Sequence, residues 1–236
     1  MTLLSYLEPG EDFPPTELAL EHPNGLLAAG GVLDSSTLVA AYRRGIFPWY
    51  EAPQPVLWWS PDPRSVLLPE ELHLSRSLRR TLRRDRFQLS MDRAFDAVIE
   101  ACAQPRPSQD GTWIGSAMSD AYRQLHREGV ARSVEVWLDG TLAGGLYGIS
   151  LGGAFFGESM FARTPDASKV ALAALCHILR QVSHSVIDCQ IESEHLNSLG
   201  ARRVSRLDFE ERLQQTVDMV VRDDIWHLPE RCGGLL

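Results

Sequence analysis

The sequence predicts an α+β protein with a small N-terminal domain at 1–62 and a larger mixed-sheet domain at 63–236. The first sixty residues are dense in Pro, Gly and Trp, which is typical of turns and irregular chain. From about residue 64 short β-type segments alternate with amphipathic helical ones. Residues 131–161 then read as three consecutive antiparallel strands. Together these observations favour one irregular domain followed by a larger α+β domain.

The N-terminal domain contains one expected helix, residues 34–45. Asp34 is a suitable N-cap and Gly45 follows the last turn. The remaining N-terminal chain is expected to be irregular. In the second domain the first elements follow from apolar spacing and capping residues. They are a strand at 64–69, a helix at 75–85, a strand at 87–91, a helix at 92–103 with Asp92 as its cap, and a helix at 116–129.

The three strands within 131–161 are separated by two hairpin-type turns, Asp139-Gly140 and Gly152-Gly153. A long apolar helix is expected at 166–183 and should pack on this meander. A buried strand at 185–192 and a last helix around 209–217 complete the order. This succession resembles the latter part of the acetyltransferase-like fold of the GNAT superfamily.

A coenzyme A site is disfavoured by the turn before the long helix. In the GNAT superfamily this turn is glycine-rich, and its amides hold a pyrophosphate at the helix N-terminus. Residues 163–168 contain no glycine here, and Pro165 removes one amide donor while Asp166 adds a negative charge. A coenzyme-A-dependent N-acetyltransferase remains the alternative that acetyl-CoA turnover would test.

Composition indicates a soluble protein of the cytoplasm. Apolar residues make up 44% and charged residues 23%, which is ordinary for a globular protein. No stretch approaches the roughly 20 apolar residues of a membrane span. The four cysteines are far apart and form no metal-ligand pattern, so we expect reduced thiols and no metal site.

One basic segment opposes the net charge of −8. Arginines recur at helical spacing within the predicted helix 75–85, so one exposed face would carry several positive charges that repel one another. A polyanion would relieve that repulsion, and we interpret the face as a phosphate-binding surface whose affinity for a nucleic acid falls steeply with salt. The candidate residues are Arg76, Arg79, Arg80, Arg83 and Arg84. A non-catalytic RNA-binding protein would use this helix alone and is the second alternative.

Several sequence blocks occur in one order over nearly the whole chain: PNGLLAAGG, AYRRGIFPW, LWWSPDPR, GTWI, GLYG, FGESMFAR and IDCQ. In order and spacing they resemble the signature blocks of the leucyl/phenylalanyl-tRNA–protein transferases. The resemblance implies transfer of Leu or Phe, with Met a further candidate, from aminoacyl-tRNA to proteins that begin with Arg or Lys. It also implies a GNAT-like second domain, no cofactor, and a product marked for proteolysis.

Aromatic and apolar residues at turn-rich or motif positions favour a pocket, because full burial of a leucine or phenylalanine side chain contributes roughly 1.5–3 kcal/mol. Tyr42 and Tyr122 belong to this set. The resemblance implies that the aminoacyl pocket is formed by Trp49, Trp113, Leu146, Phe155, Met160, Leu175 and Leu179. Other members of the family carry Met at position 146 and Phe at positions 175 and 179, so the preference between leucine and phenylalanine could differ here.

Three polar residues are candidates for the chemistry. Asp188 and Gln190 lie two apart in the apolar strand 185–192, so both should point to one face, away from Ile187 and Cys189. Both match the positions that the family uses on the incoming α-amine. A carboxylate can help the amine lose a proton, whereas a Gln amide can only orient it. The sequence does not identify the final proton acceptor.

Glu158, in the block FGESMF, is the candidate for binding the basic N-terminal residue of the protein substrate, because a carboxylate pairs well with guanidinium. The sequence leaves the oligomeric state open, with a monomer as the simplest expectation. It also leaves open the natural protein targets.

Overall fold

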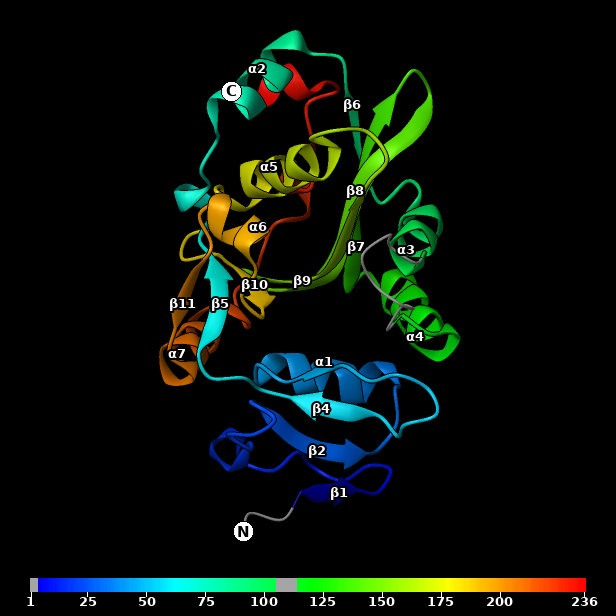
Figure 1. The fold of residues 1–236 in the computed structure, drawn as a ribbon, viewed down its shortest axis with the longest axis vertical. Coiled ribbons are helices and arrows are strands. Elements are labelled where there is room, and N and C mark those ends of the chain that lie inside the picture. Colours follow the sequence, from blue (N-terminus) through cyan, green and yellow to red (C-terminus); the bar gives the residue numbers. More distant parts are fainter. Residues whose placement is uncertain (1–3, 105–113) are drawn as a thin grey trace.

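A computed structural model describes residues 4–104 and 114–236, and in it the chain forms two β-sheets with helices around them (Figure 1). The first sheet has the order β1-β2-β4-β3. The second has the order β11-β5-β10-β9-β8-β7-β6 and contains both parallel and antiparallel pairs. The prediction of an α+β fold, with a small N-terminal unit followed by a larger mixed-sheet unit, is confirmed.

The N-terminal unit is more regular than its composition suggests. Its strands are β1 (Ser5–Leu7), β2 (Leu26–Gly30), β3 (Phe47–Pro48) and β4 (Leu57–Trp59), and the expected helix is α1 (Ser35–Arg43), where Asp34 accepts a hydrogen bond from the Thr37 amide. The expectation of an irregular chain outside this helix is therefore wrong. The strands are too short to show a period in the sequence, and flanking Pro and Gly residues hide them.

The predicted meander is present as β7 (Ala131–Leu138), β8 (Thr141–Leu151) and β9 (Ala154–Ala162), all antiparallel. The long helix α5 (Ala167–Leu179) follows, and β10 (Val186–Gln190) then pairs parallel to β9 and antiparallel to β5 (Arg64–Leu67). The succession of three strands, a long helix and a further strand that was expected from a GNAT-like domain is thus observed.

Helices cover both faces of the large sheet (Figure 1). Helix α5 and α2 (Arg76–Arg84) lie on one face, whereas α3 (Phe95–Ala103) and α4 (Ser116–Arg127) lie on the other. Alternate residues of the meander feed two cores: Leu146 and Phe155 pack with the α5 side, while Tyr147 and Phe156 pack with α3, α4 and the N-terminal unit. The remaining elements are β6 (Gln88–Met91), α6 (Glu194–Ser198), β11 (Arg202–Val204) and α7 (Arg206–Thr216).

Two helix boundaries differ from the predictions. Asp92 is not the cap of α3, which begins at Phe95. Asp92 instead has φ +57° and accepts a hydrogen bond from the Ser133 amide of β7, so its carboxylate is used by the neighbouring strand. Helix α5 ends at Leu179, before residue 183, because the chain turns there to enter β10.

The chain passes from one sheet to the other between Trp59 and Arg64, near the predicted boundary at residue 62. One hydrophobic core contains residues from both units, for example Tyr42 and Trp58 together with Tyr147 and Phe156. The division into domains at 1–62 and 63–236 therefore stays a prediction. Within the described ranges no helix is long and apolar enough to pass through a membrane.

Candidate active site

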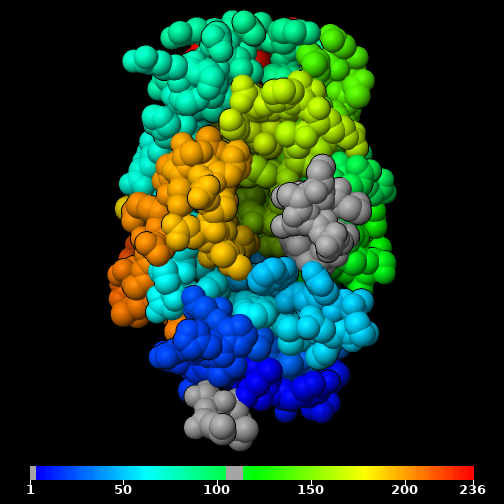
Figure 2. Space-filling model, viewed as in Figure 1, coloured from blue at the N-terminus to red at the C-terminus, as the bar shows by residue number. Residues whose placement is uncertain are grey.

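A cavity of about 700 Å³ opens where the N-terminal unit meets the large sheet. The space-filling view shows it as a hollow in the middle of one face, between the N-terminal unit and the segment around α6 (Figure 2). Its wall includes Phe47 and Trp49 from the N-terminal unit, β8, β9 and β10 from the sheet, and α5. The cavity is larger than one amino-acid side chain and can hold several groups at once.

One part of the cavity is apolar. Leu146 of β8, Phe155 and Met160 of β9, and Leu172 and Leu175 of α5 line it. Phe155 and Met160 are five residues apart in β9, and both reach the α5 side because the pairing of β9 with β8 shifts register between them. This region offers a side chain such as leucine or phenylalanine an environment from which water is largely removed.

Asp188 lies on the β10 wall and is neutralised by a buried arginine. Its carboxylate accepts hydrogen bonds from Nε and Nη2 of Arg64 at 2.8 and 2.7 Å, and the two side chains are 1% and 0% exposed. The Arg64 guanidinium also lies 4.8 Å from the ring centre of Phe47 and 4.7 Å from that of Phe209. This stacking ties the N-terminal unit and α7 to the ion pair.

Gln190 follows Asp188 through a β-bulge. The register of β10 against β5 shifts between the two residues, and Gln190 adopts φ +55°. The backbone N–H of Gln190 donates to Oδ1 of Asp188 at 2.9 Å. Ile187 and Cys189 both pack in the core on the α5 side, as the alternation predicts, and the cavity lining includes all four residues from Ile187 to Gln190.

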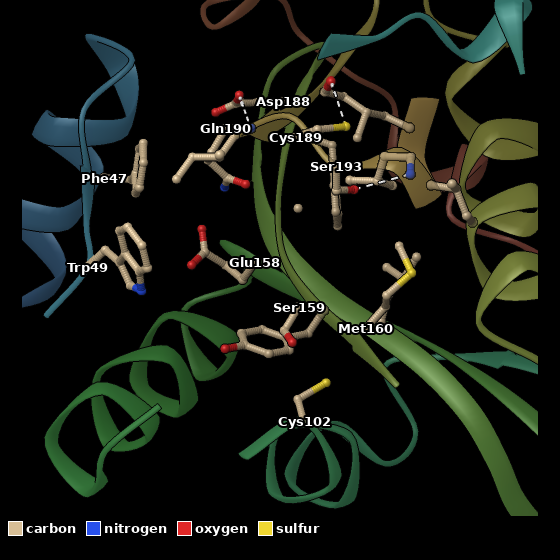
Figure 3. Close-up of a pocket in the computed structure, with 18 of the residues that line it drawn as sticks. Phe47, Trp49, Cys102, Glu158, Ser159, Met160, Asp188, Cys189, Gln190 and Ser193 are labelled. Carbon is tan, nitrogen blue, oxygen red and sulfur yellow. Dashed lines mark hydrogen bonds between the residues drawn. The ribbon is translucent and has the colours of Figure 1, made fainter. Parts of the chain in front are cut away.

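Glu158 of β9 projects into the cavity and is held by two tyrosines. Tyr42 of α1 donates to Oε1 at 2.7 Å, and Tyr122 of α4 donates to Oε2 at 2.6 Å. The two hydroxyl oxygens are also 2.7 Å apart. Figure 3 shows Glu158 across the cavity from Phe47 and Trp49, with Asp188 and Gln190 on the neighbouring wall. Burial raises the pKa of Glu158 to about 7, although the two tyrosine hydrogen bonds oppose that rise.

The structure places most of the predicted site residues around this cavity. The lining includes Trp49, Leu146, Phe155, Glu158, Met160, Leu175, Asp188 and Gln190. Tyr42 and Tyr122 are fully buried behind the wall and reach the site through Glu158. Leu179 is buried in the core on the α5 side and is not a lining residue. Trp113 lies outside the described residues.

The predicted arginine surface is a separate feature. Arg76, Arg79, Arg80, Arg83 and Arg84 are all exposed on α2, while Leu78 and Leu82 face the core. None of the five forms an ion pair with a residue in the described part of the chain. Helix α2 lies at the opposite end of the molecule from the N-terminal sheet (Figure 1), and Thr81 connects it to the start of α5 by a 2.9 Å hydrogen bond to Asp166.

Asp166 is already engaged at the turn before α5. Lys169 Nζ lies 3.1 Å from its Oδ1, and Thr81 donates to Oδ2. The sequence argument against a pyrophosphate at this turn is therefore joined by a structural one, since a carboxylate already binds the local donors. Among the described residues no group of three or more His, Cys, Asp or Glu side chains could hold a metal ion. All four cysteines are buried and in the reduced form.

Sequence reasoning missed several residues of the site. Arg64 carried a signal, because an arginine that begins an apolar strand needs a partner once it is buried. Most of the others are apolar or small residues whose contribution depends on tertiary packing. The lining residues that were not predicted are Phe47, Pro48, Glu51, Cys102, Gln104, Tyr147, Gly157, Ser159, Leu172, Ile187, Cys189, Ile191, Ser193, His195 and Leu196.

Comparison with known families gives two matches along the chain. Residues 31–62 match the model described as the leucyl/phenylalanyl-tRNA protein transferase N-terminal domain, and residues 66–214 match the model described as leucyl/phenylalanyl-tRNA protein transferase. Relatives with that transferase name include one from Pseudomonas paraeruginosa, 58% identical over 88% of this chain and 92% of its own. A relative from Azotobacter vinelandii is 56% identical over 88% of this chain and 92% of its own.

Two solved structures show only a distant likeness. One is L-PGS from Bacillus licheniformis, with 9% identity, a TM-score of 0.39 and coverage of 79% of this chain and 64% of that one. The other is the C-terminal domain of a putative lysylphosphatidylglycerol synthetase from Agrobacterium fabrum, with 10% identity, a TM-score of 0.39 and coverage of 86% and 65%. This chain spans less than two thirds of either, and at these TM-scores neither supports an argument about fold or function.

Proposed function

The chain belongs to the leucyl/phenylalanyl-tRNA–protein transferase family, and we propose that it moves a leucyl or phenylalanyl group from its tRNA to the α-amine of proteins that begin with Arg or Lys. The reaction is aminolysis of an ester, so no covalent enzyme intermediate is needed. The product would carry a new N-terminal residue that marks the protein for degradation. We place this activity in the cytoplasm, where charged tRNA is made and used.

The observation that supports the proposal most directly is the combination of an apolar region and two carboxylates in one cavity. Leu146, Met160 and Leu175 offer an aminoacyl side chain a place to bind, while Asp188 and Glu158 lie on the adjoining walls. The ester carbonyl of a bound aminoacyl group would then face the polar part of the cavity. Holding amine and ester together in this way can supply much of the rate enhancement.

Asp188 and Gln190 are proposed to receive the α-amine. The Asp188 carboxylate is held by Arg64 and offers its remaining acceptor positions to an ammonium group, while the Gln190 amide oxygen can accept a second hydrogen bond. A neutral Gln cannot keep a proton, so its contribution is orientation. The bulge that joins the two residues sets their relative geometry.

Glu158 is proposed to bind the N-terminal residue of the protein substrate. It is a carboxylate at the cavity wall that forms no ion pair with any described residue, so a cationic substrate group would supply its missing partner. Glu51, also in the lining, adds negative charge at the mouth. This distribution favours a basic N-terminal residue over an acidic one.

The α2 arginines are proposed to contact the tRNA backbone. They form an exposed basic surface without ion-pair partners in the described chain, which is the kind of surface that phosphates bind. A tRNA is long enough to reach both α2 and the cavity in one molecule. A monomer would suffice for the reaction as described.

Transfer of radiolabelled leucine from leucyl-tRNA to a peptide beginning with Arg tests the proposed function. The matched control is the same peptide with an acetylated N-terminus, which has no free amine. We expect label in the free peptide alone. No label in either peptide, together with consumption of acetyl-CoA when that is supplied, would contradict the proposal and favour the N-acetyltransferase.

A further inference from the structure

The two carboxylates that face the middle of the cavity have opposite surroundings. Asp188 accepts three hydrogen bonds, two from the Arg64 guanidinium and one from the backbone N–H of Gln190. Its side chain is 1% exposed. Glu158 accepts two hydrogen bonds, both from neutral tyrosine hydroxyls. One carboxylate is therefore paired with a buried cation, and the other has only uncharged donors within hydrogen-bond distance among the residues that the structure describes.

This difference decides which carboxylate can take up a proton. Protonation of Asp188 would leave the Arg64 guanidinium buried without a counter-charge, between the rings of Phe47 and Phe209. An unpaired buried charge is strongly unfavourable. Asp188 is thus suited to hold the amine in place. Protonation of Glu158 removes a partly buried charge that has no cationic partner in the described part of the chain, and that change is favourable to the local structure.

We propose that Glu158 is the catalytic base, the group that accepts the proton released by the incoming α-ammonium. The inference deepens the proposed function and rests on it. It also changes the role that the sequence predicted for Glu158, because the group it contacts is the α-amine of the N-terminal residue. The preference for a basic side chain then rests on the overall negative charge of the cavity.

The groups around Glu158 fit this role. Tyr42 and Tyr122 donate to its two oxygens, Tyr147 lies behind them in the core, and Asp188 and Arg64 act on it through space with opposite signs. Burial raises the pKa values of Tyr42 and Tyr122 well above their usual range, so both hydroxyls stay protonated. Burial also raises the pKa of Glu158 to about 7, close to the roughly 7.7–8.0 of an α-amine. A proton can then pass between the two groups with little change in free energy.

The proton balance is complete without a further reactant. The α-ammonium gives one proton to the Glu158 carboxylate, and the neutral amine attacks the ester carbonyl to form the new C–N bond. As the tetrahedral intermediate collapses, the C–O bond to the tRNA ribose breaks, and the second proton of the nitrogen goes to the ribose oxygen. Glu158 releases its proton to solvent after the products leave.

The test compares the wild-type enzyme with Glu158→Gln over pH 6–9, using leucyl-tRNA and an Arg peptide. Glu17→Gln, a change to an exposed carboxylate in the N-terminal unit, is the matched control. We expect the Glu158→Gln variant to lose roughly 100-fold in kcat/KM at pH 7. The loss should shrink towards pH 9, because solvent then deprotonates the amine. The Glu17→Gln variant should match the wild type at every pH.

Two further arms make the result specific. Tyr42→Phe removes a hydrogen bond that lowers the pKa of Glu158, so that pKa should rise. The increase of kcat/KM with pH on the acidic side should therefore occur at higher pH in this variant than in the wild type. A peptide with an aminooxy group in place of its α-amine needs no base at pH 7, because its nucleophile is already neutral. The Glu158→Gln variant should therefore use that peptide almost as well as the wild type does.

A pH-independent loss in Glu158→Gln, with the aminooxy peptide affected as strongly as the Arg peptide, would overturn the inference. A loss confined to KM for Arg and Lys peptides, absent for a norleucine peptide, would also overturn it and assign Glu158 to the basic side chain. Circular dichroism of the variant separates either result from misfolding. Failure of the wild-type enzyme to transfer leucine at all would count against the proposed function itself.

Discussion

The α2 surface and the cavity recognise their proposed ligands by opposite physical means. Helix α2 presents five exposed arginines from nine consecutive residues, and its charges face water and salt. The cavity draws on segments from Phe47 to Leu196, and its ion pair and tyrosines are almost fully removed from solvent. One region is local and electrostatic, while the other is assembled by the tertiary fold.

Exposed and buried charges contribute to binding and stability in different ways. Exposed charges interact weakly and are screened by salt, so several are needed and any one is dispensable. Buried charges interact strongly, but only while every partner is in place. Single substitutions should therefore have large effects in the cavity and small ones on α2.

The largest expected effect comes from Arg64→Met. The change leaves the Asp188 carboxylate buried without a cation, and the free energy of unfolding should fall by about 3–5 kcal/mol. Urea denaturation measures this, and transfer activity should be lost in parallel. Arg123→Met is the matched control, because the described carboxylates that pair with Arg123 are all exposed, and its cost should stay below about 1 kcal/mol. Equal losses for both variants would contradict the contrast between buried and exposed charge.

The next effect is on tRNA affinity. Replacing Arg76, Arg80 and Arg83 together by Gln should weaken tRNA binding roughly 10- to 100-fold at low salt. The slope of log K against log salt should fall by about 2–3, since each phosphate contact contributes about 0.7–0.9. Binding is measured by filter retention at several salt concentrations.

A control with the same change in charge uses exposed arginines on other elements, namely Arg43, Arg127 and Arg222. We expect that triple Gln variant to retain the wild-type slope. An unchanged slope in the α2 variant would show that tRNA binds elsewhere.

The smallest expected effect concerns the choice of amino acid. Leu175→Phe narrows the apolar part of the cavity, and the ratio of leucine to phenylalanine transfer should rise several-fold. The ratio is measured with the two charged tRNAs in competition. Leu179→Phe is the informative control, because Leu179 is buried but does not line the cavity. It should lower stability by about 1–3 kcal/mol and leave the ratio unaltered; a shift in ratio for Leu179→Phe alone would contradict the position of the pocket wall.

Local patterns accounted for much of the fold. Helix α2 follows from Ser75 as its cap and from leucines at helical spacing, and the meander follows from its two glycine-containing turns. The N-terminal strands were missed because two to five residues are too few to show a period. Asp92 was misassigned because its carboxylate does not cap a helix. It accepts a hydrogen bond from the backbone N–H of Ser133, a strand residue 41 positions later.

In the candidate site too, the sequence indicated some features and not others. Membership of the family and the positions of Asp188, Gln190 and Glu158 could be proposed from short blocks of sequence, because those blocks keep their order along the chain. The partners of these residues could not, since Arg64 is 124 positions from Asp188, and Tyr42 is 116 from Glu158. Whether a carboxylate meets a buried guanidinium or two neutral hydroxyls depends on which distant segments pack against it. Burial and pairing are properties of the assembled fold, and they separate a carboxylate paired with a buried cation at Asp188 from one held by neutral hydroxyls at Glu158.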